Sequence, residues 1–241
     1  MKLKENHDPM GQAIRDYFEN KLSDRLHVLS YMFDEDEIPV QYLFRLENSM
    51  PKLERHALRL AKGRVLDVGA GAGSHAIVLQ SKGLDVTAID ISPLSVETMR
   101  RRGVEHAEWA DFYTDDFGKD FDTMLFLMNG LGIAGTLKRL PELLKRCCDL
   151  MSPEGCILAD SSDLRYIYED EEGNFDPSEM VEYYGETKYW MEYKKCKGHV
   201  FDWLYVDFDT LKRVAETVGL HAEIIKQGDH YDYLARLTRI R

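Results

Sequence analysis

The stretch RVLDVGAGAGSH, residues Arg64–His75, places an acid and three glycines directly behind a short apolar run. A glycine-rich turn after a buried strand lets the backbone approach a ligand closely, and the helix that follows offers N–H donors in its first turn. The dinucleotide pattern G-x-G-x-x-G would need glycine or alanine at Ser74, but here the third glycine is Gly73. The stretch therefore predicts a nucleotide-binding loop of a different kind.

A second acid supports this interpretation. Asp90 follows the apolar run 85–89 and stands 21 residues after Gly69. At that distance a carboxylate can accept both hydroxyls of a ribose. The alternative is a turn or cap residue that leads into Ser92 and Pro93. The spacing alone does not separate a nicotinamide dinucleotide from another adenosine ligand.

Short apolar runs alternate with helical stretches after residue 63, a rhythm typical of a parallel sheet built from crossover units. We expect strands at 64–68, 85–89, 107–110, 121–128 and 155–160, with helices at about 74–81, 92–103, 140–151 and 209–219. The last two β-rich runs, 221–227 and 231–240, are joined by only three residues, so they must pair antiparallel. The predicted fold is α/β, with a doubly wound, mostly parallel sheet whose last strand is antiparallel.

Two segments lie outside this core. Residues 1–62 are predicted to be a helical extension. Its two helices each have one apolar face, made by Ile14, Tyr17, Phe18 and Leu22 in the first and by Leu53, Ala57 and Leu60 in the second. The other segment, about 183–206, holds eight aromatic residues in an alternating pattern and is predicted to be an inserted β-hairpin. We therefore divide the chain into an extension, 1–62, and a nucleotide-binding domain, 63–241.

Three motifs together carry a family resemblance. The sequences VLDVGAGAG (65–73), LDVTAIDIS (84–92) and WADF (109–112) resemble the class I, Rossmann-like S-adenosylmethionine-dependent methyltransferases. The first motif of that family has the form acid-x-G-x-G-x-G. The resemblance is good over about 60–160, holds in outline for the C-terminal strands and hardly reaches the first 50 residues. It implies a seven-stranded sheet with an antiparallel last strand.

The resemblance also implies a set of cofactor contacts. The backbone of the glycine loop would cradle the methionine part, with Asp67 orienting its ammonium group. Asp90 would hold the ribose. The remaining implied contacts are the loop residues Gly69, Ala70, Gly71 and Gly73, then Ile91 against the adenine, Asp111 at the adenine amino group, Phe112 or its backbone near the ring, and Met128 with Asn129 as the floor under the sulfonium. For Phe112 and Met128, ordinary core packing is the alternative.

The substrate would lie at the carboxyl ends of the strands, where open α/β sheets bind ligands. Methyl transfer is an in-line displacement that depends on alignment and on exclusion of water, so a strong base is optional. Asn129, Asp163 and His230 are the catalytic candidates, although a helix cap or turn is the better explanation for Asp163 and a loop position the better one for His230. In the segment Gln41–Arg45, we expect Tyr42 to close the pocket and Arg45 to bind the methionine carboxylate.

Composition narrows the range of possible methyl acceptors. The formal net charge of −12 opposes binding to nucleic acid, and NGLG at 129–132 lacks the prolines found in nucleic-acid amino methyltransferases. We therefore expect a small-molecule acceptor, for which the hairpin aromatics are either a cage or simply a packed face. No apolar stretch nears the roughly 20 residues that span a bilayer. The N-terminus does not resemble a secretory signal, and the four cysteines form no Cys-x-x-Cys pair, so we expect a cytoplasmic protein without a metal site.

Two other functions remain open at this point. One is a nicotinamide-dependent oxidoreductase on the same layers, which Ser74 and the antiparallel last strand disfavour. The other is a regulatory module that binds the cofactor without turnover.

Overall fold

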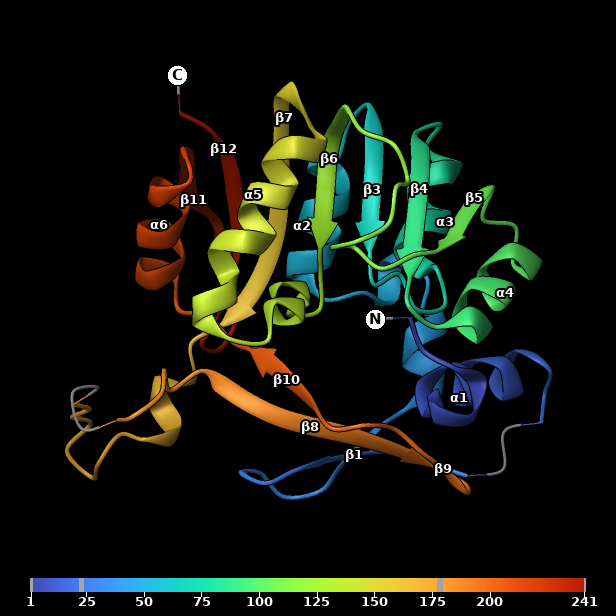
Figure 1. The fold of residues 1–241 in the computed structure, drawn as a ribbon, viewed down its shortest axis with the longest axis horizontal. Helices are drawn as coiled ribbons and strands as arrows, with labels where there is room; N and C mark the ends of the chain where they lie inside the picture. Colours follow the sequence, from blue (N-terminus) through green and yellow to red (C-terminus); the bar gives the residue numbers. More distant parts are fainter. Residues whose placement is uncertain (1, 22–23, 177–179, 241) are drawn as a thin grey trace.

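The computed structural model describes residues 2–21, 24–176 and 180–240. Within them, seven strands form a central sheet in the order β11-β12-β7-β6-β3-β4-β5 (Figure 1). Among the described residues, β12 is the one strand of this sheet that runs in the opposite direction to all the others. The predicted doubly wound sheet with an antiparallel last strand is thus confirmed. The bounds are β3 Arg64–Val68, β4 Asp85–Asp90, β5 His106–Trp109, β6 Phe121–Phe126, β7 Met151–Ser162, β11 Leu220–Gln227 and β12 Asp232–Arg239.

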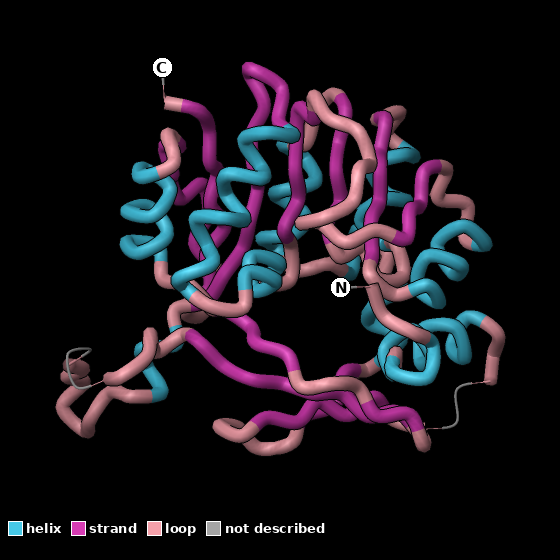
Figure 2. The backbone as a smooth tube through the Cα atoms, viewed as in Figure 1, coloured by secondary structure: helices cyan, strands magenta, loops and turns pink. Residues whose placement is uncertain are grey.

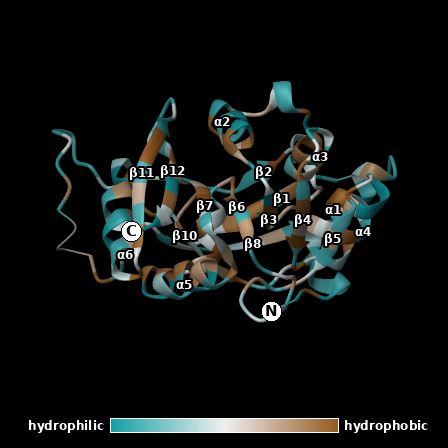
Figure 3. Cartoon of the chain, turned by 90° about the horizontal axis from the view of Figure 1, so that it is seen from above, coloured by the Kyte–Doolittle hydropathy of each residue, from teal (hydrophilic) through white to brown (hydrophobic). Residues whose placement is uncertain are grey.

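Helices cover both faces of the sheet. Seen from above, α2 and α3 lie on one side of the strands, and α5 and α6 on the other (Figure 3). Local capping fits these positions: Pro93 begins α4, and the Ser92 hydroxyl accepts from the Ser95 N–H (2.9 Å). The bounds are α1 Pro9–Phe18, α2 Lys52–Leu60, α3 Ser74–Ser81, α4 Pro93–Arg101, α5 Leu140–Leu150 and α6 Phe208–Thr217. Short 3-10 helices are η1 Glu5–His7, η2 Val40–Phe44, η3 Glu47–Ser49, η4 Gly130–Ala134, η5 Leu137–Arg139 and η6 Leu164–Ile167.

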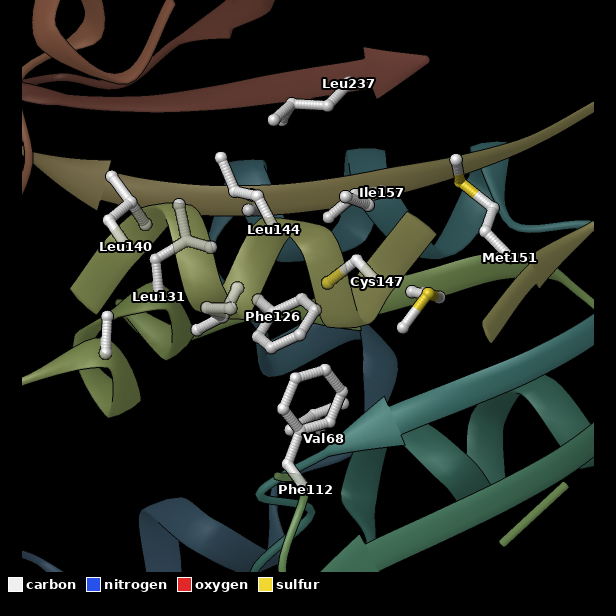
Figure 4. Packing of buried hydrophobic residues seen from close by; sticks show 14 of the residues in the cluster. Val68, Phe112, Phe126, Leu131, Leu140, Leu144, Cys147, Met151, Ile157 and Leu237 are labelled. Atoms are coloured by element: carbon white, nitrogen blue, oxygen red, sulfur yellow. The ribbon is translucent and has the colours of Figure 1, made fainter. Parts of the chain in front are cut away.

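Alternate residues of the strands supply a core on each face. On β7, Ile157 packs with α5 and α6, and its neighbour Leu158 packs with α2 and α3. Figure 4 shows the α5 side, where Phe126, Leu144 and Cys147 are fully buried. Each such side chain contributes about 1.5–3 kcal/mol on leaving water. These two cores hold the carboxyl ends of β3, β4, β6 and β7 rigidly at one edge of the sheet.

A second sheet lies across that edge (Figures 1 and 2). Its order is β10-β8-β1-β2, with β9 paired to β8. The strands are β1 Leu26–Ser30, β2 Asp36–Ile38, β8 Glu186–Tyr193, β9 Cys196–Lys197 and β10 Phe201–Leu204. The predicted inserted hairpin is confirmed as β8 with β9 and β10. We refer to the described residues of 9–44 and 186–204 together as the lid.

The N-terminal segment is only partly helical. α1 and α2 form as predicted, but β1 and β2 occupy residues where we expected helix or connection. Leu22, which we expected on the face of the first helix, lies outside the described residues. β1 pairs with β8, about 160 residues further along the chain, and local periodicity carries no signal of such a partner. Leu60 is also 38% exposed, because α2 turns Leu53, Ala57 and Leu58 inward instead.

The lid has its own small core and grips the glycine loop. Ala13, Leu26, Val40 and Tyr193 are buried together between α1 and the second sheet. Beside them, Ala72 of the glycine loop packs against lid residues, and the Ser74 hydroxyl donates to the Leu43 carbonyl (2.6 Å). Lid and loop are therefore one packed unit. In the described part of the chain, no helix is both long and apolar enough to cross a membrane.

Candidate active site

The three glycines of the loop after β3 have two different tasks. Gly69, Gly71 and Gly73 have φ values of +71°, +55° and +81°, a left-handed backbone that favours glycine. A Cβ atom at Gly69 or Gly71 would meet nothing within 4 Å, whereas one at Gly73 would come within 2.9 Å of Met99 Cγ. The first two glycines thus leave open space beside the backbone, and the third lets α3 pack closely on α4.

Asp90 ends β4 beside this loop. Its Oδ2 accepts a hydrogen bond from the Gly71 N–H (2.8 Å), and its Oδ1 accepts one from the Ser92 N–H (2.8 Å). Burial raises the pKa of Asp90 to about 6, although both N–H groups act against the rise. Each oxygen keeps a further lone pair. Asp90 therefore braces the loop and the turn into α4, and it can still accept hydroxyl groups at the sheet edge.

The next positions form a flat shelf beside β4 and β5. The Ile91 side chain is 39% exposed, and its carbonyl accepts from the Leu3 N–H (2.9 Å) and from Trp109 Nε1 (2.8 Å). Asp111 is buried, and its Oδ1 accepts from the Tyr113 N–H (2.9 Å). The segment before α1 thus lies against the residues that the resemblance assigns to the adenine.

Phe112 takes the alternative role. Its ring is 4% exposed, and its centroid lies 5.4 Å from that of Phe126, edge to face, in the core shown in Figure 4. Only its backbone is left for the contact that the resemblance implied. The ring is needed to fill the space under the third parallel strand of the sheet, β5.

A buried ionic chain runs from the glycine loop to the lid. Asp67 Oδ1 lies 4.0 Å from His75 Nδ1, and His75 Nε2 lies 2.7 Å from Glu54 Oε2. Arg45 Nη2 donates to the same Glu54 oxygen, and all four side chains are almost wholly buried. Burial alone would lower the pKa of His75, but the two carboxylates outweigh it and raise the pKa. Burial alone would likewise raise the pKa of Glu54, which His75 and Arg45 instead lower.

At the glycine-loop end of this chain, Asp67 has an unused oxygen. Its Oδ2 is buried and has no hydrogen-bond partner within the described residues. Burial raises the pKa of Asp67 against the influence of His75. A buried acceptor oxygen of this kind suits a cationic group such as an ammonium.

The turn after β6 has an unusual backbone. Met128 and Asn129 both lie in the left-handed region, with φ of +60° and +57°. The turn is held from β7, because the Asn129 N–H donates to Asp160 Oδ2 (3.2 Å) and the Ser162 hydroxyl donates to Asn129 Oδ1 (3.2 Å). Met128 is left 38% exposed at the sheet edge. Non-glycine residues adopt this backbone at a cost, and such positions cluster at functional sites.

Beside this turn lies a cavity of about 580 Å³. Its walls come from the lid, from α2, and from the ends of β6, β7 and β12. The lining residues are Tyr42, Pro51, Leu53, Glu54, Met128, Asn129, Asp160, Ser162, Tyr166, His230, Tyr231 and Asp232. The size is in the range of small-ligand sites.

The sequence candidates divide between the cavity and other places. Asn129, His230 and Tyr42 line the cavity. Asp163 does not: its Oδ1 accepts from the Tyr184 hydroxyl (2.9 Å) and from the Arg165 N–H (3.0 Å), so it caps η6. The helix-cap alternative for Asp163 is the one that the structure supports.

Arg45 also differs from expectation. Its Nη1 donates to the Tyr42 carbonyl (2.7 Å), its Nη2 donates to Glu54, and its guanidinium lies over the Tyr42 ring at 4.0 Å. It is not among the residues that line the cavity. Through these contacts Arg45 fastens the lid to α2, and its Nε has no hydrogen-bond partner among the described residues.

The aromatic cage considered for the hairpin is not formed. Of the residues described, those that line the cavity include none of the eight hairpin aromatics. Tyr193 is buried in the lid core, and Trp203 packs so closely on Gly132 that a Cβ there would lie 2.1 Å from its ring. These aromatics form the packed face of the lid.

Asp160 is the site residue that the sequence analysis missed. It follows the apolar residues 156–159 of β7, as Asp90 follows the apolar residues of β4, so an acid directly after an apolar run was the available signal. Burial raises the pKa of Asp160 to about 7, against the effect of the Asn129 N–H. Glu54 and His75 gave no such signal, since each is a single polar residue on the inward face of a helix.

Comparisons with known proteins define the family. A methyltransferase-domain family model matches residues 65–155. A crystal structure of an S-adenosylmethionine-dependent methyltransferase from Bacteroides fragilis, in complex with S-adenosyl-L-homocysteine, is 53% identical, with a TM-score of 0.94, and the match covers 100% of this chain and 98% of that one. An uncharacterized methyltransferase of Staphylococcus carnosus is 22% identical over 183 residues, 74% of this chain and 80% of that protein. YqeM of Bacillus subtilis is 30% identical over 105 residues, 41% of this chain and only 42% of that relative.

The chain therefore belongs to the class I S-adenosylmethionine-dependent methyltransferases. It is an enzyme of that family and binds S-adenosylmethionine, as the resemblance predicted. The nicotinamide oxidoreductase and the module without turnover are set aside by the same findings. The residues also fit this cofactor, because the space beside Gly69 and Gly71 is open and Asp67 Oδ2 is buried without a partner among the described residues.

Proposed function

We propose that this methyltransferase acts on a small molecule bound in the cavity beside Met128 and Asn129. The observation that carries the proposal is the position of this cavity of about 580 Å³, between the turn after β6 and the lid. A site of that size accommodates a small metabolite. The net charge of −12 argues against a nucleic-acid substrate.

The proposed roles of the cofactor residues follow from their positions. The open side of Gly69, Ala70 and Gly71 takes the amino-acid part, with Asp67 near its ammonium group. Asp90 accepts the ribose hydroxyls. Ile91 and Asp111 form the adenine shelf. Bound S-adenosylmethionine supplies an electrophilic methyl group on sulfur, and Met128 with Asn129 faces the cavity from the side where the acceptor enters.

In this proposal the lid shields the cavity from water. Tyr42 lines the cavity, and the Arg45 contact to Glu54 holds that segment down on α2. A closed lid excludes water, which strengthens every polar contact that aligns the acceptor. We also propose a reducing, cytoplasmic location, which the free state of all four cysteines supports.

The test uses labelled methyl transfer. The full chain is incubated with S-adenosylmethionine carrying a labelled methyl group and with a metabolite extract that is separated from macromolecules by size. We expect label in the small-molecule fraction, and none in added protein or RNA. Label that appears only in a macromolecule would refute the small-molecule acceptor, while leaving the methyltransferase family intact.

A further inference from the structure

The cavity is acidic and aromatic. Three carboxylates line it, those of Glu54, Asp160 and Asp232, and its walls contain no lysine or arginine among the residues described. Glu54 is already neutralised by Arg45 and His75, and Asp232 Oδ1 accepts from the His230 N–H (3.0 Å). Asp160 likewise accepts one backbone N–H, and within the described residues neither Asp160 nor Asp232 forms an ion pair. The negative charge of the cavity that no cation neutralises therefore lies at Asp160 and Asp232, and Asp160 is the one that holds the turn of Asn129.

Asp160 is also the carboxylate with an unused acceptor. Its Oδ2 takes the Asn129 N–H, and its Oδ1 is buried with no hydrogen-bond partner in the described structure. Several groups face it from the surrounding elements: Glu54 on α2 and His75 on α3 influence its charge. Tyr42 on the lid and Tyr233 on β12 also face it; burial is the main cause of their raised pKa values, and Asp160 adds to it. Because a buried acceptor left without a partner is costly, this oxygen suits a hydrogen-bond donor from a ligand.

Three tyrosines supply the other feature. Tyr42, Tyr166 and Tyr231 line the cavity and are 36%, 46% and 50% exposed. The rings of Tyr166 and Tyr231 are stacked, with centroids 4.6 Å apart and planes 16° apart. Aromatic faces attract cations, and their attraction grows when water is excluded.

We propose that the acceptor is an amine, which enters the cavity as its ammonium ion among these tyrosines and gives its proton to Asp160. This inference rests on the proposed small-molecule function and names the class of acceptor. A carboxylate and aromatic faces recognise an ammonium, whereas a carboxylate acceptor would be repelled and a hydroxyl would gain nothing from the negative charge.

The proton has to leave before the methyl group arrives. An ammonium nitrogen has no free lone pair, so it cannot attack carbon. Once its N–H proton has passed to Asp160, the freed lone pair forms the new N–C bond while the bond between sulfur and the methyl carbon breaks, and that electron pair stays on sulfur. Charge balances, because the sulfonium becomes a neutral thioether and the nitrogen becomes a methylated ammonium. Asp160, with its pKa raised to about 7, is a better base for this task than an ordinary aspartate.

The binding test uses three probes that share one ring: benzylamine, benzyl alcohol and benzoate. Each is titrated into the full chain saturated with S-adenosyl-L-homocysteine, from pH 6 to pH 8. We expect benzylamine to bind at least tenfold more tightly than the other two, and to bind more weakly below pH 7 as Asp160 takes up a proton. Asp160→Asn should remove both the preference and the pH dependence. Asp149→Asn, which removes one exposed charge at the end of α5, is the matched control and should keep both.

The outcomes separate this inference from the proposed function. Equal or tighter binding of benzyl alcohol or benzoate, failure of benzylamine to bind, or a pH dependence that survives in Asp160→Asn would each overturn the amine acceptor. Unchanged affinity of Asp160→Asn for S-adenosyl-L-homocysteine shows that the variant is folded. If it does not fold, mass spectrometry of the labelled product decides: a methylated nitrogen supports the inference, and a methyl group on oxygen or carbon refutes it. Label in macromolecules would instead refute the small-molecule function.

Discussion

The buried pair of Arg45 and Glu54 offers a sharp test of how the lid is held. Glu54→Gln keeps the size of the side chain but removes the anion between two cationic groups, Arg45 and His75. The two cations respond differently. His75 can lose its proton at pH 7, whereas a guanidinium stays charged at any ordinary pH. The variant therefore leaves Arg45 buried and charged against a neutral amide.

The expected cost follows from this difference. Removing one partner of a buried ion pair costs about 3–5 kcal/mol, and the amide oxygen still accepts one hydrogen bond, so we expect about 3 kcal/mol. That is a large part of the roughly 5–15 kcal/mol that stabilises a domain. The double variant Arg45→Met/Glu54→Gln removes the stranded charge as well and should recover at least about 1 kcal/mol relative to Glu54→Gln.

Urea unfolding of the wild type, of Glu54→Gln, of Arg45→Met and of the double variant gives the four free energies of unfolding. The pH dependence supplies a second signature. The pKa of His75 is raised above 6.5, so its pairing stabilises the fold below that pH and is lost as the pH rises through the raised value. The pKa of Glu54 is lowered below 4.5, so its contribution is lost only at more acidic pH. A cost below about 1 kcal/mol for Glu54→Gln, or a double variant less stable than the single one, would refute the reasoning.

Three further predictions concern the sheet edge. Gly71→Ala and Gly83→Ala each place a Cβ at positive φ (+55° and +82°), and each should cost about 1–2 kcal/mol of stability. Only Gly71→Ala should also weaken the binding of S-adenosyl-L-homocysteine, measured by calorimetry. Equal affinities of the two variants would contradict an open ligand side at Gly71. Asp90→Asn should weaken the same binding at least tenfold, and wild-type affinity should fall below about pH 6 as Asp90 is protonated; a flat pH profile would exclude the ribose contact. Asp160→Asn should be more stable to urea than the wild type at pH 8, by up to about 4 kcal/mol, and this gain should shrink steadily between pH 7 and pH 4, because in that range Asp160 binds a proton in the folded state but not in the unfolded chain; a gain that is equal at pH 8 and pH 4 would rule this out.

Local sequence was sufficient where a residue acts through its own backbone or at the end of its own strand. The glycine loop, Asp90 and the antiparallel β12 were all predicted, because positive φ, strand ends and a short connection each leave a local mark. Asp160 directly follows an apolar run within β7 and could have been predicted by the same rule.

Local sequence failed where a residue depends on a distant partner. The strands β1 and β2 exist because β8 pairs with β1 from the far side of the molecule, and neither segment alone is strongly β-forming. Arg45 was predicted to bind a ligand, but its Nη2 donates to Glu54 on α2, a contact that the local sequence does not indicate. Asp163 was ambiguous for the same reason, since its Tyr184 partner comes from the segment before β8.

The second sheet joins two parts of the chain that leave the ribosome at very different times. β1 and β2 are synthesised first, yet the edge of β1 that β8 covers has no partner until more than 150 further residues have been made. For that interval the nascent chain carries an open strand edge, which is a known route to aggregation. Synthesis of this protein is therefore expected to benefit from chaperone cover until residue 204, the end of β10, has emerged.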